Sequence, residues 1–262
     1  MLRISEVFIY DEPSVPEIKI KNLAEFIEKT INVKVTIRKN IFSHFGLNRK
    51  NALEMASIRI FNIYAPFEMH SPTLDEVDFE AKSFEDSSIH NNIVLYDGFE
   101  LQKFLTKIIP DEESGSDKFH LALTSKLTCT YDYDDYRYHG RAVICSNPSI
   151  ISTTGMIEAP AKPRAFYLNL HNSMNAGINL DVLKSQFEGR FLDYHDRRTD
   201  KAIQGYSMQA ISYYLTGEPF CDSPDCILYN AHWQEELLHS QIKIGKMCKR
   251  HSNIVNKNQN HA

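Results

Sequence analysis

The end of the chain carries a cluster of thiols and imidazoles that constrains the fold more than any other feature. Cys221 and Cys226 are separated by four residues, and Cys248 and His251 by two. A structural Zn²⁺ takes four such donors in a tetrahedron, and short pairs from two pieces of chain can supply them. The Asp, Ser and Pro residues inside the first pair are typical of a turn. The spacing therefore predicts a Cys3His zinc site at these four residues, with unligated thiols and a disulfide as the alternatives.

The expected cellular compartment favours metal ligation over disulfide formation. The sequence MLRISEVFIYDEP lacks the unbroken apolar core of a signal peptide, and no stretch approaches eighteen uninterrupted apolar residues. We therefore expect a cytoplasmic protein without membrane association, in a reducing compartment where clustered cysteines bind metal. Cys129 and Cys145 lie far upstream on expected strands, and we expect them to be buried small side chains.

Charge and motifs exclude several functional classes. A net charge of −5 and a pI near 6.1 provide no positive field, so we do not expect nucleic acid as a partner. The chain has no G-x-x-x-x-G-K or G-x-G-x-x-G phosphate motif and no G-x-S-x-G nucleophile turn. Nucleotide binding and serine hydrolysis by these routes are therefore unsupported. No feature of the sequence determines the oligomeric state.

Hydrophobic periodicity predicts an α/β (α+β) fold. Residues 3–10 and 33–42 have the composition of strands, and residues 18–30 between them have helical spacing. This order argues for a sheet with a crossover helix. Further strands are expected within residues 118–147. Helices are expected from about residue 181, the second of which ends at Gly217, where a left-handed cap suits glycine.

We expect one domain over residues 1–252, with no internal repeat. Residues 71–92 carry six acidic residues against one lysine and are interpreted as an exposed excursion. The Thr-Thr-Gly sequence at 153–155 predicts a turn, and Pro160–Pro163 an extended piece. A zinc-bound subregion is expected over 217–252, followed by a disordered tail over 253–262.

The stretch from about residue 204 to His251 resembles the second half of the archaemetzincin signature. In that family of the metzincin clan, a zinc-binding helix HExxHxxGxxH runs into Cys-x4-Cys, and a later Cys-x2-Cys completes a second, structural zinc site. Here Cys221 and Cys226 match the first pair, and Cys248 and His251 match the second, with His in place of Cys. The resemblance implies a metzincin-like mixed sheet with packing helices and a relationship to zinc metallopeptidases.

The catalytic part of that signature is not retained. Counting back from Cys221 places Ala210, Tyr214 and Phe220 at the positions of the three catalytic histidines, and Ile211 at that of the general base. A hydrolytic site of this kind needs three imidazoles for Zn²⁺ and a carboxylate that activates water. The resemblance thus implies a zinc-binding relative without conventional peptidase activity, whose cleft is either filled or binds a peptide or protein.

The alternative is an active metal-dependent hydrolase with a relocated site. Helical spacing could bring four side chains of AHWQEELLH onto one face as a metal and base set, although an ordinary polar face explains the same pattern. These residues are His232, Glu235, Glu236 and His239.

Two further histidines lie among charged residues. His139 stands between Arg137 and Arg141 on an expected strand, so the three could grip an anion or a peptide carboxylate. Pairing with the nearby Asp132, Asp134 or Asp135 is the simpler interpretation. His195 lies between Asp193 and Asp196, a mixture that can bind metal or begin a helix.

Overall fold

The structure is a computed structural model that describes residues 3–91, 93–175 and 179–259. Within these ranges, a five-stranded sheet has the order β2 (Lys34–Arg38), β1 (Glu6–Tyr10), β4 (Lys118–Thr124), β8 (Ser149–Ser152), β7 (Val143–Ile144). The first four strands are parallel, and β7 pairs antiparallel with β8 at the edge. A smaller sheet joins β3 (Leu95–Asp97), β5 (Leu127–Asp132) and β6 (Arg137–Arg141). The expected mixed α/β fold is confirmed.

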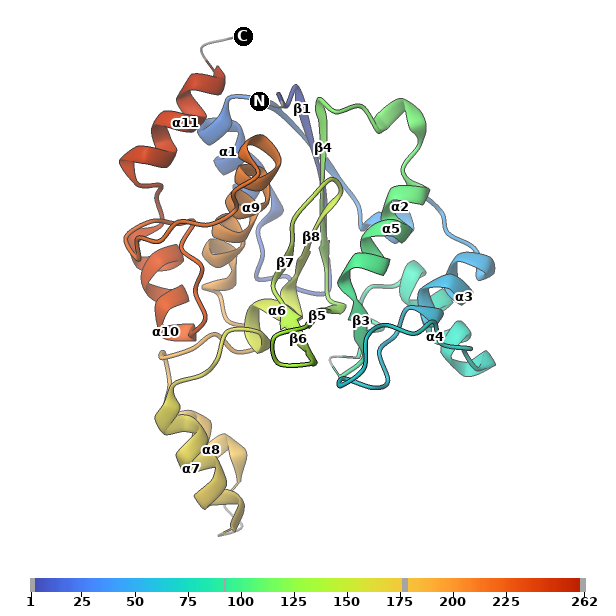
Figure 1. Ribbon diagram of the computed structural model, residues 1–262, viewed down its shortest axis with the longest axis vertical. Helices are drawn as coiled ribbons and strands as arrows, with labels where there is room; N and C mark the ends of the chain where they lie inside the picture. The colour runs from blue at the N-terminus through green and yellow to red at the C-terminus, as the bar shows by residue number, and fades with distance from the viewer. Residues whose placement is uncertain (1–2, 92, 176–178, 260–262) are drawn as a thin grey trace.

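Helices cover both faces of the large sheet (Figure 1). One face carries α1 (Ile20–Ile31), α9 (Thr199–Thr216), α10 (Gln234–Leu237), the π-helix η2 (Leu238–Ile244) and α11 (Lys249–Gln259). The other carries α2 (Ile41–His44), α3 (Arg49–Ser57), α4 (Leu74–Glu85) and α5 (Gly98–Ile108), followed by the short η1 (Asp111–Glu113). In β4, Phe119 and Leu121 pack on the first face and Ala122 on the second. A strand buried on both sides needs such a nearly continuous apolar run.

The remaining helices lie at one end of the sheet. α6 (Thr153–Glu158) follows β8, and α7 (Arg164–Asn175) and α8 (Leu180–Ser185) project from the body (Figure 1). The projecting pair has its own small core of aromatic and aliphatic side chains around Phe166. Among the described helices, none combines the length and the apolarity that a membrane crossing requires.

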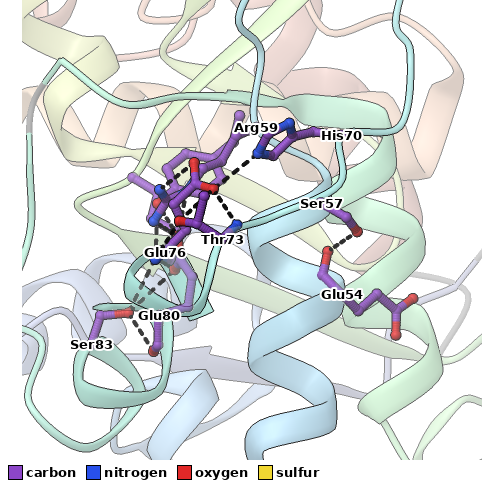
Figure 2. Close-up of polar contacts among 10 residues, drawn as sticks. Glu54, Ser57, Arg59, His70, Thr73, Glu76, Glu80 and Ser83 are labelled. Carbon is purple, nitrogen blue, oxygen red and sulfur yellow. Dashed lines mark hydrogen bonds and ion pairs between the residues drawn. The ribbon is translucent and has the colours of Figure 1, made fainter. Parts of the chain in front are cut away.

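The acidic segment 71–92 differs from the exposed excursion that its composition indicated. Its central part is α4, which begins with a capping box between Thr73 and Glu76 and buries Glu80 completely. Figure 2 shows Glu76 and Glu80 beside Arg59. Glu80 accepts hydrogen bonds from Arg59 Nη2 at 2.6 Å and Lys126 Nζ at 2.6 Å. The helix is buried because distant cations compensate its charge, and these partners cannot be identified from the composition of the segment.

Two other expectations for local structure also differ from what is observed. The predicted Thr-Thr-Gly turn is the first turn of α6, since the Ser152 side chain accepts from Gly155 N at 2.8 Å and caps a helix there. Residues 253–259, expected within a disordered tail, continue α11. Val255 explains this order because it is buried in the core cluster that also contains α9 side chains. Residues 260–262 of the expected tail lie outside the described residues.

Candidate metal centre and adjoining cleft

The structure brings Cys221, Cys226, Cys248 and His251 together. Their ligand atoms all lie within 4.8 Å of one another. The Sγ atoms of Cys221 and Cys248 are 4.0 Å apart, and His251 Nδ1 lies 3.8 Å from Cys226 Sγ and 3.1 Å from Cys248 Sγ. Tetrahedral zinc, with Zn–S near 2.3 Å and Zn–N near 2.0–2.1 Å, requires donor separations of roughly 3.5–3.8 Å. The observed separations bracket this range, and the donor types are those of a structural zinc site.

Local backbone geometry positions the sulfur atoms. α9 ends at Gly217, whose φ of 81° forms the left-handed cap, and the chain then turns through Cys221 to Cys226. Backbone N–H groups donate to two sulfurs: Ser223 N to Cys221 Sγ at 3.4 Å and Cys248 N to Cys226 Sγ at 3.3 Å. His251 enters from the first turn of α11. Such N–H···S contacts orient metal-binding thiolates and stabilise their charge.

The electrostatics of the four ligands also suit a cation. Burial raises the pKa of the Cys226 thiol to about 12, so this thiolate needs a nearby positive charge. Burial opposes ionisation of Cys248 too, but hydrogen bonds from the His251 backbone and the neighbouring thiols lower its pKa overall. Burial, with the charge of Arg250, lowers the pKa of His251 and favours the neutral imidazole that binds metal.

The segment that leads into the metal centre also lines a cleft. A cavity of about 500 Å³ lies among the end of β6, the edge strand β7, helix α9 and residues 219–232. From α9, the lining side chains are Tyr206, Gln209 and Tyr213. Gln209 is 2% exposed. Its Nε2 donates to Tyr229 O at 3.0 Å, whereas its Oε1 has no hydrogen-bond partner among the described residues.

The four positions that the archaemetzincin resemblance aligns with a catalytic motif do not form a site. Ala210 and Ile211 are fully buried in the core. Tyr214 donates its hydroxyl to Ser116 O at 2.6 Å, and of the four only Phe220 lines the cavity in the part of the chain described. The sequence analysis missed Gln209 and Tyr213, whose i, i+4 spacing is the signal that places them on one face of the helix.

A comparison with protein families identifies the family of the chain. A family model described as "Probable metallopeptidase family (DUF6775)" matches residues 3–258. The chain belongs to this family. A crystal structure of a zinc-dependent peptidase from Methanocorpusculum labreanum aligns over 96% of this chain and 100% of its own, at 12% identity and a TM-score of 0.47. No curated protein sequence matches the chain. The metallopeptidase relationship expected from the sequence is thus confirmed at the level of the DUF6775 family.

The four residues of the alternative site are not brought together in this family member. Glu236 accepts from the backbone N–H of His232 at 2.9 Å and caps α10. Glu235 pairs with Arg190 at 2.7 Å, and His239 with Asp225 at 2.8 Å. α10 has only four residues before the chain becomes the π-helix η2, so the spacing of a regular helix does not apply. Glu235 and His239 are thus paired with residues outside the set, and Glu236 contacts the backbone of His232 and not its imidazole.

The two other histidines that the sequence analysis considered, His139 and His195, each contact a carboxylate. His139 Nε2 lies 2.8 Å from Asp135, which also pairs with Arg137, as the simpler interpretation of this motif expected. Asp132, Asp135 and His139 form a second group whose donor atoms lie close together, but on an exposed hairpin. His195 contacts Glu17 at 3.3 Å, while its neighbours Asp193 and Asp196 pair elsewhere.

Cys129 and Cys145 are separate from the metal centre. Cys129 is buried on β5, and Cys145 is partly buried beside the cleft. Burial raises the pKa of each thiol to about 12. Neither cysteine belongs to a group of metal-ligating side chains among the described residues, so their positions favour packing roles.

Proposed function

We propose that the chain is an archaemetzincin-related zinc-binding protein whose zinc is structural and whose cleft binds peptide or protein segments without conventional hydrolysis. The observation that carries the proposal is the convergence of three sulfurs and one imidazole on one point. A set of four protein donors fills a tetrahedral ion and leaves no position for water, which is the arrangement of structural sites. The proposal includes a cytoplasmic location, where such thiols stay reduced.

The composition of the cleft supports the absence of metzincin-type hydrolysis. Among the described residues that line it, His232 is the only imidazole, and there is no aspartate or glutamate. The positions on α9 that face the cavity carry Gln209 and Tyr213. A catalytic zinc needs three protein ligands, and activation of its water needs a base such as a carboxylate. The lining does not provide that set.

The same cleft has features that suit an extended peptide. β7 is the edge strand of the sheet, and edge strands bind peptides by adding a strand. Aromatic and aliphatic side chains from several elements, including Tyr206 and Phe220, line the cavity. Pro219, Phe220 and residues 230–232, on either side of the segment that carries Cys221 and Cys226, also line it, so the proposed zinc would fix part of the cleft wall.

Metal stoichiometry tests the proposal. We expect one zinc per chain in the purified protein, lost in Cys226→Ser and retained in the matched control Cys145→Ser. The double variant His232→Ala/His239→Ala should also retain it. Chelation should lower the unfolding temperature of the wild type and of the control, because a structural zinc contributes directly to folding free energy.

Two outcomes would contradict the proposal of a structural zinc and a non-hydrolytic cleft. Zinc retained by Cys226→Ser would show that these thiols are not the ligands. A second ion that disappears with His232 and His239, together with chelator-sensitive cleavage of a casein substrate, would favour the relocated metal-dependent hydrolase instead.

A further inference from the structure

We propose that the cleft recognises the free carboxyl end of an apolar peptide, with Arg141 binding the terminal carboxylate. This inference rests on the proposed function of the cleft and specifies the class of ligand. It is carried by two residues of the cavity wall, Arg141 and Gln209, which present unused hydrogen-bonding groups of opposite kind.

Among the described residues, Arg141 has no anionic partner. It ends β6 and lines the cavity. Its Nε donates to Thr130 Oγ1 at 2.7 Å, but neither terminal nitrogen has a hydrogen-bond or ion-pair partner in the described part of the chain. The carboxylate of Asp97, on β3 at the other edge of the same three-stranded sheet, is already used by the N-terminus of α5 and by the Tyr138 hydroxyl at 2.7 Å. A guanidinium fork is suited to a carboxylate from outside the chain.

The backbone that carries this guanidinium is held on several sides. Arg141 O accepts from Thr128 Oγ1 at 3.0 Å and lies against Gly155, where a Cβ atom would approach it to 2.1 Å. The next carbonyl, of Ala142, accepts from Ser152 N at 2.9 Å. With the backbone fixed and Nε bonded to Thr130, the Arg141 side chain loses little conformational entropy when a ligand binds, which favours recognition.

Gln209 provides the complementary group. Because its Nε2 faces the carbonyl of Tyr229, its Oε1 is a buried acceptor that lacks a donor among the described residues. A buried polar atom without a partner is unfavourable, and a ligand N–H would satisfy it. The last residue of a peptide offers an N–H and a carboxylate in one unit. The apolar lining, with Ile144, Tyr213 and Phe220, suits an apolar side chain on that residue.

Charge complementarity favours this occupant over a peptide that merely crosses the cleft. The described lining holds no acidic group, and Arg141 is its one arginine or lysine. A peptide segment without an acidic side chain would leave the guanidinium without an anion. A free carboxyl terminus supplies the anion.

The test compares three probes on the zinc-loaded full chain by isothermal titration calorimetry. They are N-acetyl-Ala-Ala-Phe as the free acid, the same peptide as its C-terminal amide, and an N-acetylated, C-amidated tripeptide with a central Asp. We expect the free acid to bind at least tenfold more tightly than either other probe. Arg141→Met should reduce the free acid to the affinity of the amide.

Two further variants test the separate roles of Arg141 and Gln209. Arg137→Met is the matched control: it lies on the same strand but pairs with Asp135, so the preference for the acid should persist. Gln209→Leu should weaken the acid and the amide by the same factor, because both retain the N–H. Thermal unfolding of each variant verifies that the fold is intact.

Each contrary outcome is informative. Equal affinity for the free-acid peptide and its amide would overturn carboxylate recognition but not the proposal that the cleft binds peptides. Equal binding of the Asp-containing amide would overturn recognition of the chain end. No binding of any probe to the folded, zinc-loaded protein would overturn this inference together with the peptide role, whereas the zinc proposal is decided separately by metal content.

Discussion

Replacing Glu80 by glutamine should destabilise the protein more than any other conservative change on α4. Glu80 is 0% exposed, and the side chains of its partners Arg59 and Lys126 are 8% and 7% exposed. Oε1 also accepts from Tyr96 OH at 2.6 Å. The neutral amide would leave two buried cations with too little negative charge, since the next carboxylate, Glu76, lies 3.5 Å from Arg59. Breaking a buried pair in this way costs about 3–5 kcal/mol.

That loss is a large part of the roughly 5–15 kcal/mol that stabilises a typical protein. For a chain of this size it corresponds to a fall in unfolding temperature of about 6–20 °C. Differential scanning calorimetry and urea unfolding would measure it. Glu85→Gln is the matched control, an exposed carboxylate on the same helix, and should change the free energy of unfolding by less than about 0.5 kcal/mol.

A second variant distinguishes lost charge compensation from poor packing. Glu80→Met/Lys126→Met removes an anion and a cation together, so it should recover part of the stability lost in Glu80→Gln. Burial would raise the pKa of Glu80, but the charges of Lys126 and Arg59 outweigh it and lower that pKa overall. This stabilisation is therefore present above the unfolded-state pKa, about 4.3 for Glu, and is lost as the pH falls below it. Glu80→Gln within about 1 kcal/mol of the Glu85→Gln control would refute the argument.

Three further predictions follow from other parts of the fold. Gly155→Ala would place a Cβ atom 2.1 Å from Arg141 O, so calorimetry should show at least the roughly 1–3 kcal/mol loss of an overpacked site. Gly115→Ala, which meets only the flexible Asp117 side chain, should be tolerated. Burial lowers the pKa of His120, so the free energy of unfolding should decrease as the pH falls through the unfolded-state value of about 6.5, and His120→Gln should flatten that slope. Chelation of zinc should accelerate hydrogen exchange in α11 but not in α5, and equal rates with and without chelator would contradict a structural role of the metal.

The sequence predicted those features that depend on short-range chemistry. The strand β1, the helix α1 and the end of α9 at Gly217 follow from periodicity and from the conformational freedom of glycine, whose φ here is 81°. The convergence of Cys221, Cys226, Cys248 and His251 was predictable for a similar reason, because two short pairs of soft donors on turns are typical of a zinc site.

The residues of the cleft could not be predicted in the same way. Counting back from Cys221 points to Ala210, but Ala210 lies in the core and its neighbour Gln209 lines the cavity. Adjacent side chains on a helix point about 100° apart, and the count along the sequence does not say which of them faces a cleft. Likewise, the partners of Glu80 come from residues 21 and 46 positions away, a separation over which local pattern carries no information.

The proposed metal centre and the cleft share one segment of chain, residues 219–232. The backbone of Cys221 forms an isolated β-bridge with that of Tyr229. The carbonyl of Tyr229 in turn accepts a hydrogen bond from Gln209 in the cleft wall. Under the proposed function, removing one thiolate would release the turn from Cys221 to Cys226, the first turn of α11 and the adjoining part of the cleft wall together. The proposed zinc would therefore stabilise the cleft as well as the C-terminal helix.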